Sequence, residues 1–427
     1  MDNQVERSIA AVWRIESAKI VAVVARMVRD VGLAEELAQD ALVSALEHWP
    51  SQGIPDNPGA WLTTTAKHAA LDRLRRDRVL QQKLEQIGLD LEAQEALLVP
   101  DFVPDLVDRM DAARNDVIGD DLLRLMFTAC HPVLSLDARL ALTLKLLGGL
   151  STQEIARAFL VPEATMAQRI VRAKRTLGDA KVPFELPPPQ ELGERLGAVL
   201  EAVYLIFNEG YTATAGEDWM RRDLADEALR LGRMLAELAP AEPEAHGLVA
   251  LMELQASRMG ARLDNEGRPV LLLDQDRSRW DGVLLRRGLA ALERAARLEQ
   301  PRGPYVLQAE IAACHARAHV AADTDWHAIA LLYGELAQVQ PSPVVELNRA
   351  VAIGMAEGPA AGLALADALA LSGKLAGYHW LPSVRADLLS KLGRLDEARL
   401  EFERAAAMTA NGRERELLLA RARAQRS

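Results

Sequence analysis

Apolar residues recur at intervals of three and four positions along most of the chain, a spacing that places them on one face of an α-helix. Stretches rich in proline interrupt this pattern at Pro100–Pro104 and at Pro183–Gln190, where a helix cannot continue. The pattern predicts an all-α fold. We expect a helical unit at residues 1–80, an acidic linker at 81–119, a second helical unit at 120–182 and a long helical region at 190–427.

A helix-turn-helix is predicted at Leu150–Leu177. Ser151 or Thr152 can cap its first helix, and Pro162 forces a bend at Leu160–Pro162 because proline is tolerated only in the first turn of a helix. The second helix has an apolar stripe formed by Met166, Ile170, Ala173 and Leu177. Its opposite stripe is polar and contains Thr165, Gln168, Arg169, Arg172 and Arg175.

This polar stripe has the chemistry of a DNA-reading surface. Between Glu163 and Arg175 there are four basic residues and one acidic residue, although the whole chain carries a net charge of −11. Arginine and glutamine offer paired hydrogen-bond donors to base edges in the major groove, and arginine also neutralises phosphates. The alternative interpretation is a surface helix whose charges are simply solvated.

A second basic segment lies at Asp56–Arg78. Its apolar residues Leu62, Ala66, Ala70 and Leu74 follow a strict spacing of four and form a narrow packing seam. Upstream is a loop of turn-forming residues at Pro50–Gly59, flanked by Trp49 and Trp61. A basic helix beside a loop with aromatic edges suits an unstacked single strand, because bases can be pocketed and phosphates neutralised there. In the alternative interpretation both tryptophans belong to the core.

A third helix is predicted at Ala34–Trp49, and its exposed face is acidic. Leu37, Ala41, Ala45 and His48 lie on one side, and Glu36, Gln39, Asp40 and Ser44 lie elsewhere. Such a helix is usually only solvated. Beside two basic segments, it is also a candidate docking surface for a basic protein partner.

Together the three segments resemble the extracytoplasmic-function group of bacterial sigma factors in the sigma-70 family. Ala34–Trp49 is similar to the core-binding helix of region two, and Asn57–Arg76 to the helix that melts the promoter and reads its −10 element. Leu150–Leu177 is similar to the helix-turn-helix of region four. The sequence departs from the family pattern at His68, where asparagine is common, and at Leu160, where a turn glycine is usual.

The resemblance implies a set of partners and binding residues. The partners are promoter DNA and core RNA polymerase, contacted at its β′ clamp and β flap, and the acidic linker would lie in a positively lined polymerase channel. The β′ clamp would be bound by Glu36, Gln39 and Asp40. The −10 element would be bound by the loop Ser51–Gly59 and by Trp61, Lys67, His68, Asp72, Arg73, Arg75 and Arg76. The −35 element would be read by Thr165, Gln168, Arg169, Arg172 and Arg175.

The region after residue 190 is predicted to be a stack of helical hairpins similar to tetratricopeptide repeats. Small and large packing residues recur at Ala386, Leu389, Gly393, Ala398, Phe402 and Ala405, and a degenerate copy at Ala350, Ile353, Glu357, Gly362, Ala366 and Leu369. Only Arg268–Trp280 is expected to be extended. Leu123–Leu150 and Tyr204–Ala213 resemble the sigma factors that carry a long helical extension. This resemblance implies that the extension regulates the sigma activity from within the chain, with a regulatory protein or ligand as a further partner.

The composition of the chain limits the classes of protein to which it can belong. The acidic balance excludes a protein that coats nucleic acid everywhere, so any DNA contact must be local. Two cysteines, Cys130 and Cys314, cannot form a disulfide framework and suit a reducing cytoplasm. We expect neither a signal peptide nor a membrane span, because no cationic start precedes an apolar block and no run of about 18 apolar residues occurs.

No catalytic constellation, cofactor or metal is expected. Cys130-His131 and Cys314-His315, with His319 one turn beyond, could be metal ligands, but a zinc site needs about four ligands gathered in space, so packing is favoured. Asn208–Tyr211 and Asp274–Arg277 could line a ligand pocket in the extension or form hydrogen-bond networks that fix loops.

We therefore predict a cytoplasmic sigma factor that is not an enzyme. Two other classes remain open. A freestanding helix-turn-helix regulator with an effector-binding repeat domain would have no use for the basic helix at Asn57–Arg78. A repeat scaffold for protein partners would leave the two-stripe helix after Pro162 unexplained.

Overall fold

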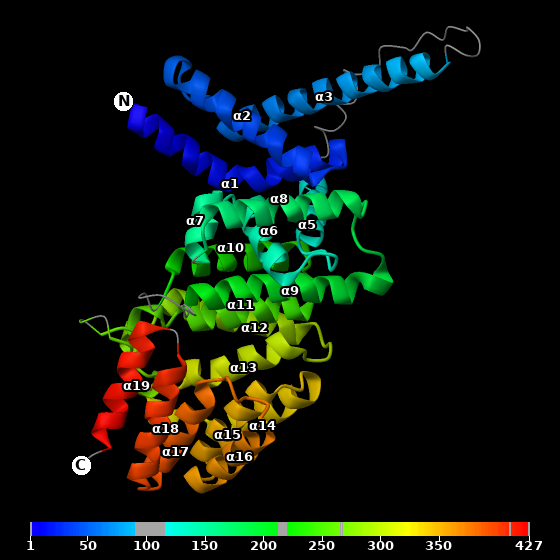
Figure 1. The fold of residues 1–427 in the computed structure, drawn as a ribbon. Helices are drawn as coiled ribbons and strands as arrows, with labels where there is room; N and C mark the ends of the chain where they lie inside the picture. The colour runs from blue at the N-terminus through cyan, green and yellow to red at the C-terminus, as the bar shows by residue number, and fades with distance from the viewer. Residues whose placement is uncertain are drawn as a thin grey trace. The chain divides into compact units, whose positions relative to one another are not determined.

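The computed structural model describes residues 2–89, 116–159, 161–211, 220–264, 266, 268–409 and 411–425. Their regular secondary structure consists of α-helices and short 3-10 turns, with an isolated bridge between Leu263 and Pro269 in place of any longer strand. The chain forms two compact units, Met1–Ala202 and Val203–Ser427 (Figure 1). The predicted all-α fold class is confirmed.

The first unit is built around three long helices and a group of shorter ones. Its helices are α1 (Asp2–Val28), α2 (Val31–Gln52), α3 (Pro58–Leu89), α5 (Asp116–Ala129), α6 (Leu136–Leu146), α7 (Thr152–Ala158), α8 (Glu163–Asp179) and the first part of α9 (Pro189–Tyr211). Helices α1, α2 and α3 pack on one another, and α1 also packs on α5 (Figure 1). Alanines at a spacing of three and four on α2 (Ala34, Ala38, Ala41 and Ala45) are fully buried, which lets the helices approach closely.

Two residues predicted to lie on packing faces are exposed. Leu74 is 37% exposed because α3 continues beyond the helices that cover its first half (Figure 1). His48 is also exposed, and its Nδ1 lies 2.7 Å from the carbonyl oxygen of Ser44 on the same helix. Helix α2 runs through Pro50 to Gln52, so the loop before α3 begins at Gly53, whose φ is +87°.

The predicted acidic linker coincides only partly with the described residues. Helix α3 extends to Leu89, past the predicted boundary at residue 80, and residues 90–115 lie outside the described ranges. Asp121, which ends the acidic stretch of the sequence, is buried in α5. Its carboxylate pairs with Arg124 at 2.7 Å and with Arg26 of α1 at 3.2 Å, so this acid ties two helices together.

The second unit is a succession of helices in which each packs on the next. Its helices are α10 (Arg222–Leu238), α11 (Pro243–Ala256), α12 (Gly282–Arg297), α13 (Pro304–Arg317), α14 (Trp326–Val339), α15 (Pro343–Ala356), α16 (Pro359–Ser372), α17 (Trp380–Lys391), α18 (Leu395–Met408) and α19 (Gly412–Ala424), with 3-10 turns at Met259–Ala261, Leu272–Asp274, Arg277–Arg279 and Ala321–Asp323. This neighbour-to-neighbour packing is typical of stacked hairpins, which bury their apolar faces only against adjacent hairpins.

Most of the small and large residues predicted to pack within the hairpins are buried between adjacent helices. Ala386, Phe402 and Ala405 are fully buried between α17 and α18, and Gly393 takes a left-handed φ of +74° in the turn between them. At Gly362, an added Cβ would lie 2.5 Å from the carbonyl oxygen of Ala350, so α15 and α16 touch through their backbones. Of the degenerate copy, Glu357 is exposed.

The prediction of an extended segment at Arg268–Trp280 is wrong. After the bridge at Pro269 the chain forms two 3-10 turns, Leu272–Asp274 and Arg277–Arg279. The described residues offer this segment no neighbouring strand to pair with, and Leu271 and Leu273 are each 38% exposed.

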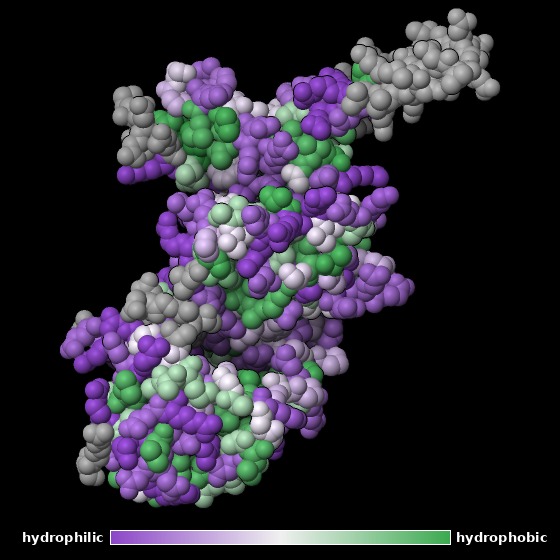
Figure 2. Space-filling model, viewed as in Figure 1, coloured by the Kyte–Doolittle hydropathy of each residue, from purple (hydrophilic) through white to green (hydrophobic). Residues whose placement is uncertain are grey.

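The face of the molecule drawn in Figure 2 is mostly polar. Figure 2 shows hydrophilic residues over much of the visible face, with hydrophobic ones scattered between them. Among the described residues, no helix combines the length and the apolar character needed to cross a membrane.

Candidate nucleic-acid and polymerase interfaces

The predicted bend separates α7 from α8. Ser151 caps α7 through a capping box, in which its Oγ accepts from the Glu154 amide at 3.1 Å and the Glu154 carboxylate accepts from the Ser151 amide at 2.7 Å. Burial alone would raise the pKa of Glu154, but the Ser151 hydrogen bonds and two nearby arginines lower it, so the cap is anionic. Pro162 is the N-cap of α8, and Leu160 lies outside the described residues.

Helix α8 presents the two stripes that the sequence predicts. The inner stripe, Met166, Ile170, Ala173 and Leu177, is buried. Of the polar stripe, Thr165, Gln168, Arg172 and Arg175 are exposed. The Arg175 side chain is 81% exposed and its ion pair with Asp179, at 3.6 Å, spans a single helical turn, so it leaves the guanidinium accessible.

Arg169 is less accessible than the other members of the stripe. Its side chain is 27% exposed and its Nη2 lies 3.3 Å from a carboxylate oxygen of Asp137, at the start of α6. Asp137 is itself 66% exposed, so water screens this pair and its energy is about 0–1 kcal/mol. A groove of about 330 Å³ beside α8 is lined by Thr165, Gln168, Arg169 and Arg172. Neither Arg169 nor Arg172 is sealed inside the unit.

Val171 was missed by the sequence analysis. It is 63% exposed and adjoins Arg172 on the accessible side of α8. The available signal was its position, because Val171 is out of phase with the buried stripe at Met166, Ile170 and Ala173. An exposed apolar side chain at such a place can contact a thymine methyl group in the major groove.

The basic segment of α3 projects its charges into solvent. Leu62, Ala66 and Ala70 are fully buried, and Lys67 is half-buried. The exposed residues are His68, Asp72, Arg73, Arg75 and Arg76. Arg73 pairs with Asp77 at 3.2 Å and Arg75 with Asp72 at 3.6 Å. These exposed pairs are weak, so a phosphate can displace the carboxylates at little cost.

The two tryptophans beside this helix have different environments. Trp49 is 2% exposed and belongs to the core, whereas Trp61 is half-buried and meets Trp49 edge to face with ring centroids 5.4 Å apart. The loop between them is largely exposed, including Ile54 at 40%. Asn57 accepts from the amide of Ala60 at 3.1 Å and so fixes the start of α3. The interpretation as core residues therefore holds for Trp49.

The acidic helix α2 carries an exposed stripe with a central apolar residue. Glu36, Asp40 and Glu47 are exposed at helical spacing, and Val43, which lies between them, is 51% exposed. Val43 was not predicted from the sequence as part of this surface. Acidic residues around an exposed apolar side chain are suited to a partner with a basic, partly apolar surface.

Gln39 differs from the other predicted polymerase-binding residues. It is half-buried, and its amide donates to the carboxylate of Glu35. Glu35 is buried and pairs with Lys174 of α8 and, at 3.6 Å, with Lys145 of α6. Burial lowers the pKa of both lysines. Gln39 thus belongs in part to an internal ion cluster that joins α2 to α6 and α8.

The side chains of the two cysteine–histidine pairs make packing and hydrogen-bonding contacts within the fold. The Cys130 thiol lies 3.3 Å from the hydroxyl of Thr143, and burial raises its pKa to about 11, so this thiol keeps its proton at neutral pH. His315 packs edge to face on Trp326. Throughout the described part of the chain, no group of three or more His, Cys, Asp or Glu side chains could hold a metal ion.

The two polar segments of the extension, Asn208–Tyr211 and Asp274–Arg277, lie in different surroundings. Arg277 donates to the carbonyl oxygens of His315 and Ala318, the latter at 2.6 Å, and to Thr324 at 3.2 Å, so Asp274–Arg277 contributes to a network that fixes loops. Asn208, in contrast, lines a pocket.

Comparison with known proteins gives matches in three parts of the chain. Residues 14–79 match Sigma-70 region 2, residues 124–177 match Sigma-70, region 4, and residues 195–296 match a family of unknown function, DUF6596. The uncharacterized protein R00370 of Rhizobium meliloti is 45% identical over 390 residues, which are 91% of this chain and 89% of the relative.

Two relatives with sigma-factor names match the first part of the chain. The probable ECF RNA polymerase sigma factor SigI of Mycobacterium tuberculosis is 26% identical over 182 residues, 43% of this chain and 58% of SigI. The ECF RNA polymerase sigma factor SigK of Mycobacterium ulcerans is 29% identical over 163 residues, 37% of this chain and 78% of SigK. No solved structure gives a significant match.

Proposed function

Since the chain belongs to the extracytoplasmic-function group of the sigma-70 family, with a long C-terminal extension, we propose that it binds core RNA polymerase and directs promoter recognition and melting. The observation that carries the proposal is the geometry of α8, whose buried apolar stripe holds an exposed stripe of donors outward. In this role the polymerase supplies the chemistry, and we assign no catalytic group to this chain. We also propose that the protein acts in the cytoplasm, where it would meet core RNA polymerase and promoter DNA.

For the −35 element, we propose that Thr165, Gln168, Arg172 and Arg175 contact DNA directly. Their exposure and the groove beside them support base contact in the major groove. Arg169 joins them after exchanging Asp137 for DNA, an exchange that costs little because the pair is open to water.

For the −10 element, the proposed surface is the exposed side of α3 with the loop before it. Arg73, Arg75 and Arg76 would neutralise phosphates, together with Lys67. His68, Asp72 and the exposed edge of Trp61 would contact the unstacked bases. The fixed start of α3 at Asn57 supports this arrangement, because it holds the loop beside the basic helix.

For polymerase binding, the proposed surface is the stripe of Glu36, Asp40 and Val43 on α2. It combines acidic side chains for electrostatic steering with an exposed apolar residue for contact, a combination suited to the β′ clamp. Gln39 would contribute from its half-buried position. We propose that the β flap contacts the first unit.

Run-off transcription with purified core polymerase tests the −35 assignment. Arg172→Ala should weaken −35-dependent initiation by about 1–3 kcal/mol if the guanidinium contacts a base. Arg7→Ala, which removes an exposed arginine from α1, is the matched control and should initiate like the unaltered chain. Equal initiation by the Arg172 variant on matched and scrambled −35 sequences would refute its role. Operator binding by the free chain that polymerase does not improve would favour a freestanding regulator.

Polymerase association tests the surface on α2. Glu36→Gln should slow association with core polymerase, and the difference should shrink as salt is added, because an exposed charge acts mainly through steering. Glu185→Gln removes an exposed acid outside α2 and is the control. Equal association rates for both variants would contradict the assignment.

We further propose that the extension regulates the sigma activity from within the chain, through a partner protein or ligand. The 45% identity to R00370, which spans 91% of this chain, supports treating the extension as part of the functional protein. Comparing the full chain with one that ends at Lys181 tests this proposal. Unchanged polymerase affinity and initiation after the deletion would refute it.

A further inference from the structure

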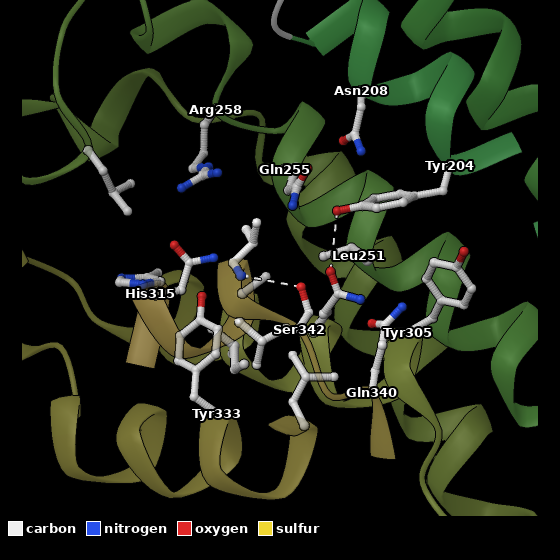
Figure 3. A pocket seen from close by; sticks show the side chains of 18 of the residues that line it. Tyr204, Asn208, Leu251, Gln255, Arg258, Tyr305, His315, Tyr333, Gln340 and Ser342 are labelled. Atoms are coloured by element: carbon white, nitrogen blue, oxygen red, sulfur yellow. Dashed lines mark hydrogen bonds between the residues drawn. The ribbon is translucent and has the colours of Figure 1, made fainter. Parts of the chain in front are cut away.

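The second unit contains a pocket that the sigma-factor role does not use. It has a volume of about 580 Å³ and is lined by residues of α9, α11, α13, α14 and α15 (Figure 3). Asn208 and Arg258 project into it from one side and Tyr333 from the opposite side (Figure 3). A concave site of this size suits a small organic molecule.

The pocket has one positive charge and no negative charge among the described residues that line it. Arg258 is the cation, and the structure gives it no carboxylate partner among the described residues. Its Nη2 donates to the hydroxyl of Tyr211 at 2.8 Å, while its Nε is buried without a hydrogen-bond partner. Burial, with the guanidinium groups of Arg258 and Arg277 nearby, lowers the pKa of His315 to about 4, so this lining residue is neutral. A partly buried cation with an unused donor is suited to an anionic ligand.

Neutral hydrogen-bonding groups surround this cation. Five amide side chains line the pocket, those of Asn208, Gln255, Gln308, Gln340 and Asn348, and an amide carries both donors and an acceptor. Burial raises the pKa of Tyr333 to about 12, so its hydroxyl keeps its proton and can donate. These groups would pair with hydroxyl or amide groups of a ligand.

The rest of the wall is aromatic and aliphatic. Tyr204 and Tyr305 meet edge to face with ring centroids 5.4 Å apart, and Leu251 and Ile311 also line the pocket. Such surfaces bind the flat apolar body of a ligand. We propose that this pocket binds a small organic carboxylate with an aromatic body and at least one hydroxyl or amide group, and that Arg258 pairs with the carboxylate.

Thermal unfolding of the full chain with 4-hydroxybenzoate as the probe tests the proposal, and 4-hydroxybenzamide is its neutral match. The carboxylate at about ten times its Kd should raise the Tm by about 3–5 °C, and the amide at the same concentration should change it much less. Inorganic phosphate is a third probe, which supplies an anion without the aromatic body. We expect it to raise the Tm less than the carboxylate does.

Two variants remove the proposed charge complementarity in different ways. Arg258→Gln removes the cation and should abolish the carboxylate-dependent shift. Asn348→Asp places a negative charge in the lining at an exposed position where the described residues give the side chain no hydrogen bond, so it should fold normally and still weaken carboxylate binding at least tenfold. The control Gln338→Glu makes the same change of charge at an exposed site of α14 outside the lining, and it should keep the full shift.

The outcomes separate clearly. A shift that is specific to the carboxylate, lost in the Arg258→Gln variant, reduced to about a third or less in the Asn348→Asp variant and kept in the control, supports the proposal. An equal shift with the amide, an unchanged shift in the Asn348→Asp variant, or no shift with millimolar 4-hydroxybenzoate would overturn it. These measurements use neither polymerase nor DNA, so their failure leaves the proposed sigma-factor role untouched.

Discussion

Replacing Glu35 by glutamine is expected to loosen the packing of α2 on α6 and α8 in the first unit. The Glu35 side chain is 7% exposed, and it pairs with Lys174 and with Lys145. The variant keeps the size of the side chain and a hydrogen-bonding oxygen, but it leaves two lysines of a buried cluster without their shared carboxylate. The stability that the variant loses therefore comes from electrostatic interactions and not from packing volume.

The magnitude follows from the burial of the three groups. Removing one partner of a fully buried ion pair costs about 3–5 kcal/mol, because the remaining charge stays buried without compensation. The Lys174 and Lys145 side chains are 20% and 15% exposed, so water reaches them in part and the expected cost falls to about 2–3 kcal/mol. Burial already lowers the pKa of both lysines, and losing Glu35 should lower it further. Between the lowered pKa of these lysines in the folded variant and their ordinary pKa of 10.5, the unfolded chain binds more protons than the native chain. Raising the pH through that range should therefore reduce the free energy of unfolding that the Glu35→Gln variant loses.

Hydrogen exchange of the full chain is the appropriate assay, because two units need not unfold in one transition. Amides of α2 and α8 should exchange about 30–150-fold faster in the Glu35→Gln variant, the factor that corresponds to about 2–3 kcal/mol. Amides of the second unit should be unaffected.

A neighbouring residue supplies the control. Glu36→Gln makes the same chemical change one residue away, but Glu36 is exposed, so its effect on exchange should stay within about 0.5 kcal/mol. Adding Lys174→Met to Glu35→Gln removes one of the stranded cations and should restore part of the protection. If Glu35→Gln and Glu36→Gln exchange at the same rates, the reasoning from burial is refuted.

Three further predictions concern stability. Ser151→Ala should cost about 1 kcal/mol and increase exchange in α7, because it removes the cap of that helix; unchanged exchange would contradict the capping role. Gly362→Ala should destabilise the second unit by about 1–3 kcal/mol in urea unfolding, since its Cβ would meet the backbone of α15. Gly334→Ala, in open space on α14, should stabilise it by up to about 1 kcal/mol, and equal effects would disprove the close approach. His315, whose folded pKa of about 4 lies below its ordinary 6.5, should destabilise the second unit by up to about 3 kcal/mol as the pH falls from 6.5 to 4, because the unfolded chain takes up the proton first. Exchange in α13 measured against pH checks this, and a flat profile would argue against a buried neutral histidine.

The features that could be predicted from the sequence are those that depend on local periodicity. The alternation on α8 places Ile170 inside and Arg172 outside whatever surrounds the helix, because side chains four residues apart share a face. The capping residue Ser151 and the bend before Pro162 act within one or two turns, so neighbouring residues suffice to predict them. The same local rules placed Ala386 and Phe402 at the packing face of a hairpin.

Other properties depend on which helices cover which, and the sequence does not contain that information locally. Leu74 has the spacing of a core residue, yet it is exposed because none of the described helices covers that part of α3. Gln39 has the spacing of a surface residue, yet its amide is bound to Glu35, whose partners lie more than a hundred residues away on α6 and α8. The pocket around Arg258 likewise gathers residues from five helices and from the segments between helices, from Tyr204 to Tyr378. The sequence by itself determined the helices and their faces, since these follow from interactions within a few residues. Only the tertiary structure decided which faces are buried, which charges are paired and where a cavity remains, because these depend on contacts between segments distant in the chain.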